Sequence, residues 1–270
     1  MRSVSLHELI RTSARAAREW LSVRHSLRAE AFAVLALYAG YEATRGLVVG
    51  DSTAAVRHAH QVASLERSLH LLLEHRVQAA AELVPGLIGT FGVAYLTLHL
   101  TATSAFLLWI YRRRPAAYPL IRTTLLLASL LALVGFILYP TAPPRLAGLD
   151  IADTISGPHI DLNRGLVSSL YNPFAAIPSM HVGYAVVVGV GLFRYARRRT
   201  VRLAGVLYPL FVLLVIVATG NHFLVDAAAG AAVAGAALGI ALGLVQTSRS
   251  ASLRSVPGGK REQAPARQAA

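Results

Sequence analysis

The sequence predicts an all-α, polytopic membrane protein with six transmembrane helices, an N-terminal amphipathic helix and an interfacial helix near residues 54–82. Hydrophobic residues make up 55% of the 270 residues and charged residues only 14%, whereas about a quarter of the residues in soluble domains are charged. Spanning a bilayer takes about 20 apolar residues. Uncharged stretches of at least that length recur at 83–111, 123–144, 165–193, 203–225 and 227–248.

Three parts of the chain follow from this pattern. Residues 1–28 contain six Arg and predict a cytoplasmic amphipathic segment. Residues 29–246 form the predicted membrane domain, and residues 247–270 are polar enough to predict a disordered cytoplasmic tail. The six spans are expected at about 29–49, 85–110, 118–139, 178–195, 203–219 and 222–246.

The spans differ in character. Glu42 and Arg45 interrupt the first span, and because they are three residues apart they could pair on one helix face. Pro178 stands at the expected first turn of the fourth span, a position that tolerates proline. The last span is rich in Ala and Gly, which permits close packing between helices.

The segment at 51–82 is too polar to span, but its apolar residues recur at helical spacing and predict a helix lying on the membrane surface. We expect its opposite face to be solvated, with pairing among Glu66, His70 and Glu74. A metal or haem protein that uses His99 and the histidines of 58–75 is an alternative, but their spacing matches no tight metal-ligand pattern. We therefore expect neither a metal nor a cofactor.

The distribution of basic residues predicts the orientation in the cell membrane. Nineteen Lys and Arg lie in the segments that six spans and a cytoplasmic N-terminus would place inside, and five lie in the segments placed outside. Both termini are then cytoplasmic. The same pattern argues against nucleic acid as a partner, because the net charge of +13 is spread between apolar runs and does not line one soluble face.

Two polar stretches fall on the predicted outer face, and Asn172 and Asn221, which begin them, are expected to line a site there. His222 and Asp226 are four residues apart, so the carboxylate can hold one imidazole nitrogen and leave the other free to attack. His181 supplies a second imidazole as a general acid. These groups suit transfer of a phosphoryl group.

The anion itself would be held by other groups at the same face. Arg145 carries a planar donor fork suited to phosphate oxygens, and Ser179 can donate a further hydrogen bond. The fourth and sixth spans both begin at this face, and helix N-termini favour anions.

These motifs resemble those of a known family. The stretches PTAPPR (140–145), PSMH (178–181) and NHFLVD (221–226) are similar to the three signatures of the type 2 phosphatidic acid phosphatase superfamily of membrane enzymes, and most similar to its inositolphosphorylceramide-synthase-like branch. The resemblance covers roughly residues 50–246. It implies a six-helix fold and a phosphohistidine intermediate, with His222 as nucleophile, Asp226 as its orienting carboxylate and His181 as general acid. Arg145 and Ser179 match the phosphate-binding positions.

The sequence departs from the broader superfamily at cationic positions. Leu138 stands where the superfamily has a Lys, Val215 and Ile216 replace a Ser-Arg pair, and Met180 replaces a Gly of the second motif. Fewer cations suit a phosphodiester better than a phosphomonoester, which carries nearly two negative charges.

The predicted function is therefore a phosphotransferase or phosphatase that acts on a lipid-linked phosphate, with water or an alcohol such as inositol as the acceptor. The alternative is a non-catalytic lipid-binding or scaffold protein of the same fold.

Overall fold

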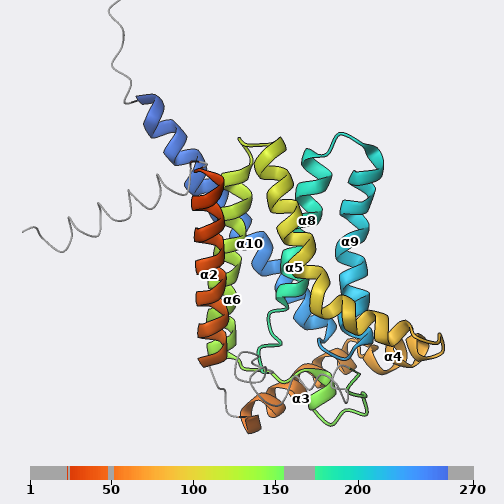
Figure 1. Cartoon of the computed structure of the whole chain (residues 1–270). Coiled ribbons are helices and arrows are strands. Elements are labelled where there is room, and N and C mark those ends of the chain that lie inside the picture. Colours follow the sequence, from red (N-terminus) through yellow and green to blue (C-terminus); the bar gives the residue numbers. More distant parts are fainter. Residues whose placement is uncertain (1–22, 24, 48–51, 155–173, 255–270) are drawn as a thin grey trace, which may run out of the picture.

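The computed structural model describes Val23 and residues 25–47, 52–154 and 174–254, and every regular element among them is helical (Figure 1). The all-α prediction is therefore confirmed. The elements are α2 (Leu27–Leu47), α3 (Ser52–Ser68), α4 (Glu74–Glu82), α5 (Leu87–Arg113), α6 (Tyr118–Leu138), the short 3₁₀ helix η1 (Pro144–Leu146), α8 (Met180–Tyr195), α9 (Arg199–Ala218) and α10 (Leu224–Arg254).

Four of these helices are long and apolar enough to cross a membrane: α5, α6, α9 and the Leu224–Val245 part of α10. This is fewer than the six predicted. Helix α2 has the length but carries Arg28, Glu30, Glu42 and Arg45 within its 21 residues. Helix α8 is apolar but has only 16 residues, whereas a span takes about 20.

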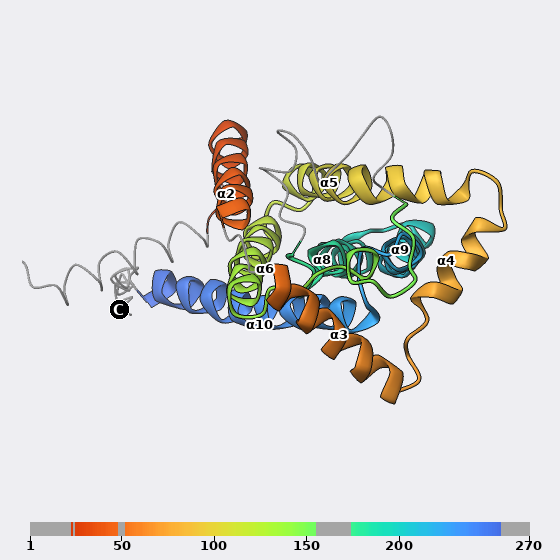
Figure 2. The same cartoon turned by 90° about the horizontal axis from the view of Figure 1, so that it is seen from below.

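Helix α8 lies in the middle of the bundle, packed against α5, α6, α9 and α10 (Figure 2). Small residues allow the closest of these contacts. A Cβ atom added to Gly205 of α9 would lie 2.8 Å from the carbonyl oxygen of Gly189 in α8, so only glycine fits at this crossing. Because α8 is central and short, its N-cap residue Ser179 is fully buried. Ser179 is therefore enclosed by protein, whereas His181 in the first turn of α8 is half-buried.

A buried ion pair joins α2 to α6. Arg122 Nη1 donates to Glu30 Oε1 at 2.6 Å, and the Tyr118 hydroxyl donates to Glu30 Oε2 at 3.2 Å. Both charged side chains are almost completely buried. Removing one partner of such a pair leaves the other charge buried and uncompensated, so the pair fixes where α2 lies against the bundle.

The predicted interfacial helix is two helices, α3 and α4, separated by a turn in which His70 has a φ of 57°. The expected solvated face is wrong for Glu66 and Glu74, which are both 0% exposed. The apolar face of α3 packs beneath the loops of the bundle, where Ala55 and Ala59 share a core cluster with Phe223. Both helices lie at the same end of the bundle, where α3 crosses α10 and α4 packs at the edge against α5 and α9 (Figure 2).

Several boundaries differ from the prediction. Pro178 lies two residues before α8, after a cis peptide bond, and Ser179 is the N-cap. Helix α10 continues to Arg254, beyond the predicted end of the membrane domain at 246. The predicted amphipathic segment lies almost entirely outside the described residues, as do residues 255–270, Asn172 and the side chains of Glu42 and Arg45.

Candidate active site

The structure brings five of the predicted residues to one end of the bundle. Arg145 lies in η1, Ser179 and His181 lie at the start of α8, and His222 and Asp226 flank the start of α10. This is the end covered by α3 and α4 (Figure 1). The rings of His181 and His222 have centroids 5.5 Å apart, so residues 41 positions apart in sequence are close neighbours in the fold.

Two acceptors hold the same nitrogen of His222. Its Nδ1 lies 3.0 Å from the carbonyl oxygen of Ala176 and 3.3 Å from Asp226 Oδ2. The Ala176 carbonyl oxygen can only accept a hydrogen bond, so Nδ1 is the donor nitrogen and these two contacts leave Nε2 open. The shorter of the two contacts is to a backbone carbonyl, which the sequence pattern did not indicate.

Asp226 also ties together the two helix starts that bear the site. Its Oδ2 accepts the Phe223 N–H at 2.9 Å, and its backbone oxygen accepts the Ser179 N–H at 2.9 Å. The approach of these segments requires glycine at 230, because a Cβ there would overlap the carbonyl oxygen of Ser179. The position of Ser179 is therefore set by α10 as well as by α8.

Ser179 has a free hydroxyl. Its side-chain oxygen is buried and has no hydrogen-bond partner among the described residues. A buried polar atom without a partner costs free energy, and such atoms are common where a ligand supplies the missing bond. The hydroxyl lies at the start of α8, where the first backbone N–H groups also favour an anion.

His181 is enclosed by aromatic rings from α5. The Tyr95 ring stacks on it with centroids 4.4 Å apart, and the His99 ring meets it edge-on at 4.3 Å. Tyr95 also lies 6.4 Å from the ring of His222. These contacts show that His99 lies beside the predicted site, and they fix the plane of the His181 ring.

Arg145 is buried and its donor fork is already engaged. Nε donates to Asn221 Oδ1 at 3.0 Å, and Nη1 donates to Asp153 Oδ2 at 2.7 Å. Asn221 is in turn held by Thr219, whose hydroxyl accepts from Asn221 Nδ2 at 2.9 Å. Asn221 thus positions the guanidinium, while Asp153 competes for it with any incoming anion.

Two buried glutamates reach the site from the helices beneath it. Glu66 Oε1 accepts the Val225 N–H at 2.6 Å, and Glu74 Oε1 accepts the Leu224 N–H at 3.2 Å. Burial raises the pKa of Glu66 to about 9, and the neighbouring carboxyl groups of Glu74 and Asp226 raise it in the same direction. Glu66 is therefore held as the neutral acid at neutral pH.

Sequence reasoning missed four of these residues: Tyr95, Asp153, Glu66 and Glu74. Tyr95 and His99 are four positions apart on one predicted helix, which is a signal that the two rings share a face. The sequence predicts a solvated position for Glu66 and Glu74, because a polar segment usually faces water. Among the histidines of 58–75, His58 stacks on Tyr139 and its Nδ1 lies 2.7 Å from the Pro140 carbonyl oxygen, which is a structural contact.

Comparison with protein families adds an independent observation. The model of the PAP2 superfamily matches residues 60–240, a range that includes every residue placed in the candidate site above. No curated protein and no solved structure matches the chain.

Proposed function

Since the chain belongs to the PAP2 superfamily, whose fold is that of phosphatases and phosphotransferases, we propose that it is an integral membrane enzyme that transfers phosphoryl groups from a lipid through a phosphohistidine at His222. One observation carries the proposal. Nδ1 of His222 is held by two acceptors at 3.0 and 3.3 Å, while the ring of His181 lies 5.5 Å away. A nucleophile with a fixed tautomer thus faces a second imidazole.

The reaction proceeds in two halves. In the first, Nε2 of His222 attacks phosphorus, the bond to the leaving oxygen breaks, and protonated His181 donates its proton to that oxygen. In the second, His181 takes a proton from water or an alcohol, whose oxygen attacks phosphorus and breaks the P–N bond. Arg145, Ser179 and the N-terminus of α8 stabilise the charge that develops on the phosphoryl oxygens.

We further propose that the domain crosses the membrane six times, with α2 and α8 as the additional spans. Following the chain colours in Figure 1, the helices α2, α5, α6, α8, α9 and α10 run alternately in opposite directions. The excess of Lys and Arg in the connections at the far end favours a cytoplasmic location for that end and for both termini. The candidate active site is then on the extracytoplasmic face of the cell membrane.

The small number of cations at the site supports a proposal for the substrate class. Val215 and Ile216, at the positions of the superfamily's Ser-Arg pair, are buried in an apolar cluster, and Arg145 is already shared with Asp153. This supports a phosphodiester as the donor, because it carries one negative charge. An alcohol acceptor such as inositol would then give a headgroup transferase, the activity of the branch that the motifs most resemble.

Product identity tests this proposal. Membranes with the wild type, His222→Ala or the matched control His60→Ala, an exposed histidine of α3, would receive labelled phospholipids and polyprenyl phosphates, with and without inositol. Free phosphate from the wild type and His60→Ala alone would identify a lipid phosphatase, and a new product that requires the alcohol would identify a transferase. Equal results for all three proteins would favour a non-catalytic lipid-binding protein.

A further inference from the structure

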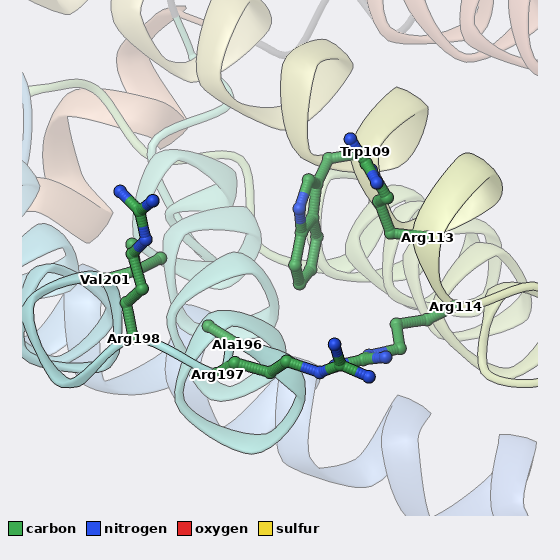
Figure 3. Close-up of a pocket in the computed structure, with 7 residues that line it drawn as sticks. All are labelled: Trp109, Arg113, Arg114, Ala196, Arg197, Arg198 and Val201. Atoms are coloured by element: carbon green, nitrogen blue, oxygen red, sulfur yellow. The ribbon is translucent and has the colours of Figure 1, made fainter.

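A basic cavity lies at the other end of the bundle, where α5 ends and α9 begins (Figure 3). Its volume is about 660 Å³, within the range of about 300–1,000 Å³ that is usual for small-molecule sites. It is separate from the candidate active site, because α8 lies between them: Ser179 caps one end of that helix and the cavity adjoins the other. Sixteen helical residues extend about 24 Å.

The cavity gathers positive charge without a counter-charge in its lining. Arg113, Arg114, Arg197 and Arg198 line it together with Trp109 and apolar side chains, and none of the lining residues is acidic. Figure 3 shows the guanidinium groups of Arg114 and Arg197 directed toward one another across the cavity. Four like charges in one cavity repel each other unless an anion binds among them.

One side chain of the cavity lining, Arg114, is held in place by hydrogen bonds. Arg114 Nε and Nη2 donate to the Tyr195 carbonyl oxygen at 3.1 and 2.9 Å, which ties the end of α5 to the end of α8. Arg198 is the N-cap of α9, and no side chain caps that helix. The first N–H groups of α9 therefore add to the attraction for an anion.

The surroundings favour a lipid as the source of that anion. Guanidinium groups match phosphate oxygens through two parallel hydrogen bonds, and Trp109 is of the residue type that favours the boundary between headgroups and hydrocarbon. Large apolar side chains are exposed on the helices that meet at the cavity, among them Leu108 of α5 at 39%, Phe193 of α8 at 48% and Leu203 of α9 at 58%. These surfaces can lie against acyl chains while the arginines hold the headgroup.

We propose that this cavity binds the phosphate of an anionic phospholipid headgroup. The site is independent of the proposed catalytic function, because it uses none of the same residues. A soluble phosphate ester offers the same phosphate chemistry and is the competing source.

Quenching of Trp109 fluorescence tests the proposal. The chain has two tryptophans, so Trp20→Phe leaves Trp109 as the single reporter. The full-length Trp20→Phe protein would be placed in two sets of phosphatidylcholine vesicles. One set contains phosphatidylglycerol with brominated acyl chains, and the other contains phosphatidylcholine with brominated acyl chains. We expect brominated phosphatidylglycerol to bind about five-fold more tightly than brominated phosphatidylcholine.

Matched triple variants separate the cavity from general surface charge. Arg113→Gln, Arg197→Gln and Arg198→Gln together remove three lining arginines, whereas Arg112→Gln, Arg194→Gln and Arg199→Gln remove three exposed arginines from the same end outside the lining. We expect the ratio of the affinities for brominated phosphatidylglycerol and brominated phosphatidylcholine to fall to about 1 in the first variant and to stay at about 5 in the second. An equal loss in both, or no preference in the starting protein, would overturn the proposal.

Two further measurements keep the test decisive. If the triple variant does not fold, Arg197→Gln alone should lower the preference and Arg199→Gln alone should not. Glycerol 1-phosphate is then added to vesicles of phosphatidylcholine only. A change in Trp109 fluorescence that the lining variant abolishes, with no preference for phosphatidylglycerol, would assign the cavity to a soluble phosphate ester and reject the lipid.

Discussion

Glu66 and Glu74 accept hydrogen bonds from consecutive backbone amides, those of Val225 and Leu224, at the start of helix α10. The two side chains come from different helices, α3 and α4, at this end of the bundle. The same helix start carries Asp226 and follows directly on His222. The buried carboxyl pair therefore fixes the segment from which the proposed nucleophile and its partner project.

The Glu66 proton should make stability depend on pH. Because the pKa of Glu66 is raised from 4.5 to about 9, the folded protein keeps a proton that the unfolded chain loses above about pH 4.5. The stabilising contribution is complete below that pH and is lost as the pH rises toward 9. We expect the Tm to fall between pH 5 and 9, and Glu66→Gln, which mimics the neutral acid, to flatten that fall. The control is Glu82→Gln, an exposed glutamate of α4; equal slopes in all three proteins would contradict the assignment.

Asp226→Asn should reduce the rate far less than His222→Ala. The backbone oxygen of Ala176 lies 3.0 Å from Nδ1 in the wild type and should keep the same tautomer in the Asn variant. In a serine protease, by contrast, replacing the sole orienting carboxylate with an amide costs about 10⁴-fold. We expect kcat to fall about 10- to 100-fold in Asp226→Asn, and turnover to be abolished in His222→Ala. Steady-state kinetics on both purified variants, with circular dichroism as the check on folding, would decide; similar losses in the two would show that Ala176 does not substitute for the carboxylate.

Gly230→Ala should disturb the position of Ser179. The added methyl group would overlap the Ser179 carbonyl oxygen, and such overpacking typically costs about 1–3 kcal/mol. We expect a lower Tm together with weaker binding of vanadate, a phosphoryl-transfer mimic. Gly235→Ala in the same helix has no neighbour within 4 Å of the added Cβ and should leave both measurements unchanged. Unaltered vanadate binding in Gly230→Ala would separate Ser179 from phosphate recognition.

Asp153→Asn should strengthen substrate binding. The Asp153 carboxylate lies 2.7 Å from Arg145 Nη1 and is 25% exposed, so it competes with a phosphate group for the same guanidinium. Removing its charge should lower KM about two- to ten-fold with little change in kcat. Asp150→Asn, an exposed residue three positions earlier whose φ of 56° asparagine also tolerates, serves as the control. A higher KM in Asp153→Asn would mean that the carboxylate positions Arg145 instead of competing for it.

The sequence was most informative where apolar length and motif spacing decide the outcome. The helices α5, α6 and α9 and the Leu224–Val245 part of α10 fall within a few residues of the predicted spans, because long uncharged runs leave few alternatives. The count of spans predicts that the fourth and sixth spans begin at the same face. In the structure this arrangement brings Ser179, His181, His222 and Asp226 together at one end of the bundle.

The misses have a common physical origin. A carboxylate in a polar segment is predicted to face solvent. Glu66 and Glu74 are buried because α3 and α4 pack against the end of the bundle, and this packing is not apparent from the local sequence. The Ala176 carbonyl carries no side-chain signal at all. Asp153 lies in a stretch without periodicity, so its contact with Arg145 depends on a loop path that local sequence does not specify.

The contacts of Glu74 and Glu66 with α10 join positions 150 and 159 residues apart in sequence. During synthesis the two carboxyl groups are complete long before the amides that they bind leave the ribosome. The proposed active site can therefore be completed only after the start of α10 has been synthesised. A chain that terminates before Leu224 lacks both Asp226, the proposed partner of His222, and the amides that the two glutamates bind, so we expect premature termination to give a protein without the proposed activity.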